Sequence, residues 1–325
     1  MKVLRISAVA AMLACCCMIR TSASAEQFPS RVVKFLVPQA AGGATDVFAR
    51  KLAQMLSERW GQPIIVENRA GAAGVLGTDV VAKSAADGYT LLVTYAGSQA
   101  VNPSLYPNLP FDSVKDFQPI ATLARTPFLL VVNPKLPAKD LREFIALARQ
   151  KPGILTFASS GIGSVNHLLG EMLKVQAGIN ILHVPYRGVA PAIADVIARH
   201  VDSAFSSVPS VLGSIGGGQV RALAVSSAKR VAVAPGVATI AESGFPGFDV
   251  NPWWGILAPA RTDTAVVRRI NADVNELLQD KDLIDFLATQ GAEPFATSPE
   301  GFLAILKSDV EKWAKVIKAA DVKLN

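Results

Sequence analysis

The chain has 325 residues, of which half are hydrophobic and 18% are charged, and its formal net charge is +6 at neutral pH. This composition is typical of a well-packed globular protein and excludes a largely disordered one. No run of Lys and Arg is interleaved with aromatic residues, so we expect no binding to nucleic acid. The three histidines lack metal-ligand spacing, and neither a dinucleotide nor a phosphate-loop motif occurs, so no metal and no cofactor is expected.

Residues 1–25 have the features of an export signal. Lys2 and Arg5 precede an apolar stretch that is too short to cross a membrane, and an Ala-Ser-Ala tripeptide ends at Ala25. We therefore expect cleavage after Ala25 and release into the periplasm, with a buried N-terminal helix as the alternative reading. Cys15 follows a segment that loosely resembles a lipoprotein box, so lipid anchoring at Cys15 is a second alternative. The chain beyond residue 25 contains no cysteine and therefore no disulfide.

The next segment predicts a strand, a loop of small residues and a helix. Residues 32–37 form the apolar run of a buried strand, and Thr45 or Asp46 can cap the helix that follows the loop. A helix that begins behind a glycine loop presents unpaired N–H groups and a positive dipole end, which suit a carboxylate or phosphate. The alternatives are a tight strand–helix turn without a ligand and, for Asp46, a capping role only. The expected ligand contacts in this loop are Gly42, Gly43, Ala44, Thr45 and Asp46.

Strand and helix patterns then alternate along the chain, which favours βαβ units and therefore an α/β fold. Further strands are predicted at residues 64–68, 90–94, 117–122, 128–132, 154–159, 181–185, 201–205, 221–226 and 251–258. Helices are predicted at residues 137–150, 165–177, 190–200, 265–279, 281–290 and 299–320.

This order predicts two lobes, each a mixed, mostly parallel sheet flanked by helices. Residues 26–124 and 254–325 are assigned to the first lobe and residues 125–253 to the second. Two crossing segments, near residues 123–128 and 250–254, are expected to form a hinge. In open α/β sheets ligands bind at the carboxyl ends of the strands, so loops that face each other across the two lobes predict a binding cleft.

A second small-residue loop repeats the opening pattern in the second lobe. Its hydroxyl groups and glycine backbone lie at the start of a helix, and helix capping alone is the alternative. His167 is expected to be a buried hydrogen-bonding residue rather than a ligand contact. Trp253 and Trp254 are expected to pack in the hinge region, with one aromatic wall in the cleft as the alternative. The expected contacts in this loop are Ser159, Ser160, Gly161 and Ser164.

Several segments together carry a resemblance to a known family. They are VPQAAGGATDVFAR, IIVENRAGAAGVLGTDVVAKSAADGYTLL, FASSGIGSVNHLLGEML, HVPYRGVAPAIADVIARHVDSAF, VRALAVSSAKR and NPWWGILAPA. In this combination and order the chain resembles the Bug-type substrate-binding proteins of tripartite tricarboxylate transporters. The resemblance covers nearly all of the chain beyond the signal.

The resemblance implies a two-lobed periplasmic binding protein fold (type II-like) with a small carboxylate between the lobes. It implies that backbone amides, short hydroxyls and ordered waters hold the ligand. It also places loops at residues 95–98, 186–188 and 205–207 around the cleft, where Arg187 is either a surface charge or a clasp between the lobes. Gln39 and Ser206 depart from the usual family pattern and could alter ligand choice. The resemblance thus adds Gln39, Tyr95, Ser98, Tyr186, Arg187 and Ser206 to the expected contacts.

The predicted function is that of an extracytoplasmic receptor without enzymatic activity. Its ligand is expected to be a small organic acid, either a mono-, di- or tricarboxylate or an aromatic acid. Its partners are expected to be the small and large membrane subunits of a transporter, and the receptor itself is expected to be a monomer. One alternative is a sensor that presents the same cleft to a signalling partner. Another is a secreted hydrolase that pairs His167 with one of the hydroxyls of Ser159, Ser160 or Ser164.

Overall fold

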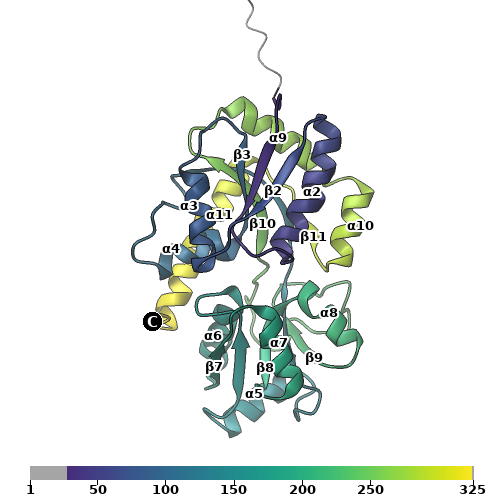
Figure 1. Cartoon of the computed structure of the whole chain (residues 1–325). Helices are drawn as coiled ribbons and strands as arrows, with labels where there is room; N and C mark the ends of the chain where they lie inside the picture. The colour runs from purple at the N-terminus through teal and green to yellow at the C-terminus, as the bar shows by residue number, and fades with distance from the viewer. Residues whose placement is uncertain (1–27, 324–325) are drawn as a thin grey trace, which may run out of the picture.

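The computed structural model describes residues 28–323, so the predicted signal cleavage after Ala25 and lipid anchoring at Cys15 lie outside the described residues. The described chain forms two β-sheets, each with its own helices, one above the other in Figure 1. The predicted α/β, two-lobed architecture is therefore confirmed. Within residues 28–323 no helix is both long and apolar enough to cross a membrane.

The first lobe is built on a six-stranded sheet. In spatial order its strands are β11 (Glu293–Pro294), β4 (Phe117–Arg125), β10 (Trp253–Pro259), β3 (Thr90–Tyr95), β1 (Val33–Val37) and β2 (Ile64–Asn68). Its helices are α2 (Ala44–Trp60), α3 (Val75–Ala82), α4 (Asn102–Leu105), α9 (Thr264–Leu277), α10 (Lys281–Thr289) and α11 (Pro299–Ala319). Two short helical segments, η1 (Ala72–Gly74) and η2 (Gly97–Val101), precede α3 and α4.

The second lobe is built on a five-stranded sheet. In spatial order its strands are β7 (Leu182–Pro185), β6 (Thr156–Ser159), β8 (Ser203–Ser207), β5 (Phe128–Val132) and β9 (Arg221–Val225). Its helices are α5 (Leu141–Gln150), α6 (Val165–Ala177), α7 (Val189–Ala198) and α8 (Val208–Gly216).

The strand β1 is apolar along its whole length because helices cover both faces of its sheet. Phe35 belongs to the cluster that includes Phe48 and Leu52 of α2, while Leu36 belongs to the cluster that includes Val81 of α3. Successive side chains of a strand point to opposite faces, so each face of β1 packs on a different helix. This packing fixes the end of β1, and with it the loop that leads into α2.

Both sheets are mixed, as predicted. The sequence also predicted that parallel pairs would predominate, and in the structure they do not. The strands β2, β1 and β3 pair in parallel, as do β7, β6 and β8, whereas β10 runs antiparallel to both β3 and β4. The strand β5 likewise runs antiparallel to both β8 and β9. The chain leaves the first lobe along β4 and returns along β10, so these two neighbouring strands must run in opposite directions.

The two crossing segments lie side by side between the lobes. The amide of Thr126 donates to the carbonyl of Pro252 at 3.2 Å, and the amide of Val250 donates to the carbonyl of Ser226 at 2.8 Å. The hydroxyl of Thr126 also donates to the carbonyl of Gly291 in the first lobe at 2.8 Å. The chain thus passes between the lobes along these two paired backbone segments (Figure 1), and α11 of the first lobe also packs against α6 of the second.

Candidate ligand-binding site

A cavity of about 620 Å³ lies between the two lobes, within the range typical of small-molecule sites. From the first lobe it is lined by Gln39, Ala40, Ala41, Gly42, Gly43, Ala44, Thr45, Tyr95 and Trp254. From the second lobe it is lined by Phe128, Ser160, Asn166, Arg187, Gly188, Val189, Ala190, Pro191, Ser207 and Ser210.

The first-lobe loop opens the N-terminus of α2 toward the cavity. Gly42 has the left-handed φ of 81°, and the N-cap residue Gly43 provides no side-chain acceptor for the first amides of the helix. The loop is held from behind by Asp46, whose carboxylate accepts from the amide of Gly42 at 2.8 Å and from Arg50 Nε at 3.0 Å. Burial by itself raises the pKa of Asp46, but hydrogen bonds from Arg50, Gly42 and Asn68 outweigh it and hold this pKa below its usual value.

Two helices of the second lobe also begin at the cavity without a side-chain cap. The N-cap residue of α7 is Gly188, and that of α8 is Ser207, whose hydroxyl hydrogen-bonds Ser210 at 2.9 Å instead of capping its own helix. The amides of Val189 and Ala190 in the first turn of α7 therefore have no side-chain acceptor among the described residues.

Helices that start away from the cavity are treated differently. A side-chain oxygen accepts from a first-turn amide in α5 (Asp140), α9 (Asp263), α10 (Asp280) and α11 (Ser298). The helix α6 begins close to the cavity and is nevertheless capped, by Ser164. Among the described helices of eight or more residues, the remaining uncapped one is α3, whose N-cap Gly74 lies beside Gln39 and Ser98. Uncapped, electropositive helix ends are thus concentrated around one cavity, where they favour an anion.

An aromatic wall completes the first-lobe side of the cavity. The indole N–H of Trp254 donates to Thr45 Oγ1 at 3.0 Å, and its ring stacks with Tyr95 at 6.0 Å and meets Phe48 edge-on at 5.3 Å. Trp253, the next residue of β10, points to the opposite face, where its N–H donates to Asp309 at 2.8 Å. One tryptophan therefore lines the cleft and the other packs in the first-lobe core.

Comparison with known proteins agrees with this geometry. The sequence model of the family described as "Tripartite tricarboxylate transporter family receptor" matches residues 48–322. The chain belongs to this receptor family. It is 39% identical to "Protein BugT" of Bordetella pertussis over 94% of each chain, and 40% identical to the "UPF0065 protein in tcbD-tcbE intergenic region" of Pseudomonas sp. over 90% of this chain and 87% of that protein.

Several relatives of this receptor have solved structures, and two of these structures contain a bound ligand. The structure described as "R. palustris Rpa4515 with adipate" has a TM-score of 0.85 and 35% identity, and covers 91% of this chain and 99% of its own. The structure of MatC from Rhodopseudomonas palustris "with bound malate" has a TM-score of 0.80 and 32% identity, and covers 89% of this chain and all of its own. "Structure of periplasmic binding protein BugD" has a TM-score of 0.81 at 35% identity.

The second-lobe loop of the receptor engages most of its hydroxyl groups internally. Ser159 Oγ hydrogen-bonds His183 Nε2 at 2.6 Å, and Ser164 Oγ accepts from the amide of His167 as a helix cap. Only Ser160 of the four residues predicted here lines the cavity, and its hydroxyl donates to Asn166 Oδ1 at 2.8 Å. The hydroxyl of Ser164 also donates to the carbonyl of Gly161, which keeps the loop compact.

Two of the three histidines of the second lobe, His167 and His183, form a stacked pair beneath that loop. The rings of His167 and His183 lie 3.8 Å apart, and His167 Nδ1 accepts from the amide of Gly163 at 3.0 Å. The sequence-based hydrolase alternative paired His167 with a serine hydroxyl, but the ring that contacts Ser159 is His183. Burial, together with the neighbouring charge of His167, lowers the pKa of His183 to about 3, so this ring is a weak base.

Three other predicted contacts point away from the cavity. Ser98 accepts from Gln39 Nε2 at 2.7 Å and donates to the carbonyl of Ala73, so it supports the loop rather than lining the cleft. The hydroxyl of Tyr186 donates to Asp195 at 2.5 Å, and burial followed by this hydrogen bond raises the pKa of Tyr186 to about 12. Ser206 is fully buried in β8 and is absent from the lining.

Several lining residues were not predicted from the sequence: Ala41, Phe128, Asn166, Val189, Ala190, Pro191 and Ser210. Ser207 lies in the loop at residues 205–207 that was expected around the cleft, although it was not named as a contact. The available signal was proline in the first turn of two helices. Pro191 follows Gly188 by three residues and Pro209 follows Ser207 by two, a pattern that marks helix starts at the ends of strands.

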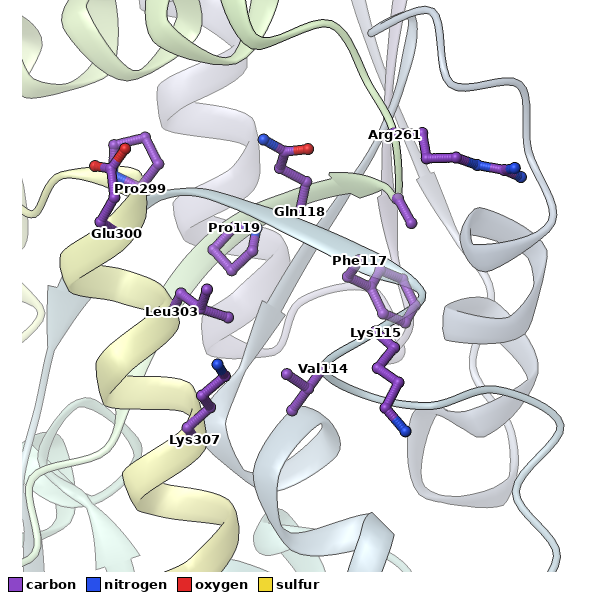
Figure 2. A pocket seen from close by; sticks show the side chains of 11 residues that line it. Val114, Lys115, Phe117, Gln118, Pro119, Arg261, Pro299, Glu300, Leu303 and Lys307 are labelled. Atoms are coloured by element: carbon purple, nitrogen blue, oxygen red, sulfur yellow. The ribbon is translucent and has the colours of Figure 1, made fainter.

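A second hollow, of about 440 Å³, lies on the first lobe alone, between the start of β4 and the start of α11 (Figure 2). Its charged side chains are Lys115, Arg261, Glu300 and Lys307, and no predicted ligand contact lines it. Because the second lobe contributes nothing to this hollow, relative movement of the lobes cannot enclose a ligand there.

Proposed function

We propose that this protein captures a small organic carboxylate between its lobes and delivers it to a transporter of the tripartite tricarboxylate type. The observation that carries the proposal is the convergence of α2 from one lobe and α7 and α8 from the other, all uncapped, on one cavity. Their free amides and dipole ends can hold a carboxylate without a dedicated ion pair. The adipate and malate bound to structural relatives support this ligand class.

Capture is proposed to involve closure of the lobes about the crossing segments. A ligand that contacts amides of both lobes binds the closed state more tightly than the open one and therefore shifts the population toward it. The lobes already approach closely where Gly163 of the second lobe lies against Leu105 of the first. A Cβ atom added at Gly163 would come within 2.1 Å of Leu105 Cδ1, so the contact has no room for a side chain. One chain supplies both sides of the cavity, which supports a monomeric receptor that presents its closed form to the small and large membrane subunits.

The direct test is native mass spectrometry of gently purified protein that begins at Glu26. We expect a co-purified organic acid, whose affinity isothermal titration calorimetry then measures. At a concentration of about 100 times Kd, the acid should stabilise the fold by about 2.7 kcal/mol and raise Tm by roughly 5 °C. If no acid co-purifies and no member of a carboxylate panel shifts Tm, the proposed function is wrong.

We also propose that the receptor acts in the periplasm after cleavage behind Ala25. Mass spectrometry of the secreted chain and cell fractionation test this, and a lipid-linked chain retained at Cys15 would contradict it. A sensor would use the same cleft. Deletion of the receptor should abolish uptake of the acid, whereas unaffected uptake with a lost transcriptional response in the same deletion strain would favour the sensor.

Hydrolysis is not part of the proposal. The hydroxyl of Ser159 is buried, its partner His183 is a weak base, and neither residue lines the cavity. A general base with a pKa near the working pH is far more effective than one near 3. Turnover of an ester that Ser159→Ala abolishes would overturn this part of the proposal.

A further inference from the structure

We propose that the cleft is built for an aromatic monocarboxylate, a ligand with one carboxylate and a flat apolar body. This inference rests on the proposed function and selects one ligand class within it. The first observation concerns charge: of the side chains that line the cavity, Arg187 is the charged one, and the rest are neutral. Arg187 immediately precedes Gly188, the N-cap of α7, so its charge adds to the anion-attracting end of that helix.

Most neutral polar groups of the cavity already have partners within the protein, and the unpartnered Oε1 of Gln39 is an acceptor that cannot bind a carboxylate. Ser160 donates to Asn166, whose own amide donates to the carbonyl of Phe205 at 2.7 Å. Ser207 and Ser210 hydrogen-bond each other. A second carboxylate placed beyond the helix ends would therefore lose its hydration without a matching set of donors, which is costly for a charged group.

The remaining lining is apolar and includes an aromatic ring on each side. Trp254 and Tyr95 belong to the first lobe and Phe128 belongs to the second, and the other apolar side chains of the lining are Ala40, Ala41, Ala44, Ala190, Val189 and Pro191. Flat ligands gain from contact with ring faces beyond the area that they bury. Small side chains around such rings leave room for a planar body.

The first-lobe rings are held rigidly and Trp254 is only 3% exposed, so a ligand meets the small part of these rings that stays uncovered, and little ordering is required. The N–H of Trp254 is bound to Thr45, one edge meets Phe48, and its face lies 23° from the plane of Tyr95. Preorganised rings contribute more to affinity than mobile ones because their conformational entropy is already lost. Thr45 accepts from Trp254, which leaves its single O–H proton available to a carboxylate at the start of α2.

Titration calorimetry of the purified receptor with four acids tests the inference: benzoate, cyclohexanecarboxylate, adipate and malate. We expect benzoate to bind at least about 10-fold more tightly than either dicarboxylate, and about 3- to 10-fold more tightly than cyclohexanecarboxylate, which lacks a flat ring. If adipate or malate binds as tightly as benzoate, the ligand class is overturned and the receptor function stands. If none of the acids binds, both the inference and the proposed function fail.

A variant of the second-lobe ring separates stacking from general packing. Phe128→Leu should weaken benzoate binding about 3- to 10-fold and leave adipate binding within about twofold. Equal losses for both acids would overturn stacking on Phe128. Should this variant fold poorly, tryptophan fluorescence of the unaltered receptor replaces it: benzoate should change the emission, and Trp254→Phe should remove most of that change. A change that persists in full would place the ring elsewhere.

Discussion

Helix ends that face the cavity and helix ends that face solvent are built by opposite rules in this receptor. At the outer ends, Asp140 of α5 and Ser298 of α11 accept from first-turn amides, which stabilises a helix by about 1 kcal/mol each. At the cavity, Gly43 and Gly188 stand in the same position and leave the amides open. Glycine at an N-cap costs only a few tenths of a kcal/mol relative to a capping side chain, so the open amides are retained at little expense in stability.

The helix α6 shows where the two rules meet. It begins close to the cavity, yet Ser164 caps it, and the preceding loop is tied down by Ser159 and the His167–His183 pair. The loop before α2 is closed by Asp46 from behind and leaves its amides free. Two loops of similar composition thus differ in function. The hydroxyl groups of the loop before α6 are hydrogen-bonded within the protein, whereas the loop before α2 has no hydroxyl group and leaves its amides open.

The strongest way to break the comparison is to give α2 the kind of cap that the outer helices have. Gly43 has φ −76° and ψ 165°, and a Cβ atom there would meet nothing closer than the carbonyl of Ala40 at 3.5 Å, so Gly43→Asp is compatible with the fold. Its carboxylate should accept from the open amides and repel the ligand, since two charges near 4 Å interact by about 4 kcal/mol at an effective dielectric constant of 20. We expect at least about 100-fold weaker binding by calorimetry.

The matched control is Gly43→Asn, which caps the helix without a charge. It should weaken binding by roughly 10-fold, because it removes amides from the ligand but adds no repulsion. Both variants should unfold at a temperature equal to or above that of the unaltered protein. If the aspartate variant keeps full affinity, the N-terminus of α2 does not hold the ligand.

Much of the fold was predictable because helix ends carry chemical signals. The boundaries of α6 were predicted as Val165–Ala177, where Ser164 caps one end and Gly178 takes the left-handed conformation at the other. The helix α8 was not predicted, since its apolar residues do not follow a clear helical period, its last residue is Gly216, and Gly217 and Gly218 follow it. Mostly parallel pairing was expected, but the return of the chain along β10 is a tertiary feature that local patterns do not encode.

The site was predictable only in part, for a related reason. The small residues of the loop at Gly42 and Gly43 predicted a binding loop, and this loop lines the cavity. Val189 and Ala190 contribute backbone amides, which do not depend on the type of side chain and therefore leave no signal in the sequence. Phe128 could not be distinguished by sequence from an ordinary residue of a buried strand. Ser98, Ser159 and Ser164 have the right side chains, but their hydroxyls are committed to neighbouring groups of the protein.

A second prediction concerns the loop before the capped helix α6. It tests how His183, which lies beneath this loop, makes the stability of the protein depend on pH. His183 stays neutral in the folded protein down to about pH 3, near His167, Glu171 and Lys174, whereas in the unfolded chain it takes up a proton near pH 6.5. Between these values the unfolded state binds more protons, so stability must fall as the pH falls from 6.5 toward 3. We expect this ring to account for a loss of about 2 kcal/mol, reduced from the full shift because the ring is partly exposed.

Urea unfolding of the receptor and of His183→Gln at pH 7.0 and pH 4.5 measures this loss. The glutamine side chain keeps an acceptor for Ser159 but does not titrate, so the variant should lose less stability on acidification. Equal losses in both proteins would show that His183 is not the titrating group.

A third prediction removes an outer cap. Asp140 Oδ1 accepts from the amide of Glu143 at 2.9 Å, and Glu143 reaches back to the amide of Lys139. Asp140→Ala should therefore lower the free energy of unfolding by about 1 kcal/mol and leave ligand affinity unchanged. Chemical unfolding and calorimetry on the same preparation separate the two effects. A loss of affinity comparable with that of Gly43→Asn would erase the distinction between outer and inner helix ends.

The smallest expected effect concerns Arg187, the charged side chain at the cavity. It is exposed, and an exposed charge near an anion contributes roughly 0.5 kcal/mol and is screened by salt. Arg187→Gln should weaken binding about twofold at low ionic strength, and the difference from the unaltered receptor should vanish near 0.5 M salt. Titrations across a salt series provide the measurement. If affinity instead falls steeply with salt and the variant binds more than 10-fold worse, an ion pair with Arg187 rather than the amides of the helix ends holds the carboxylate.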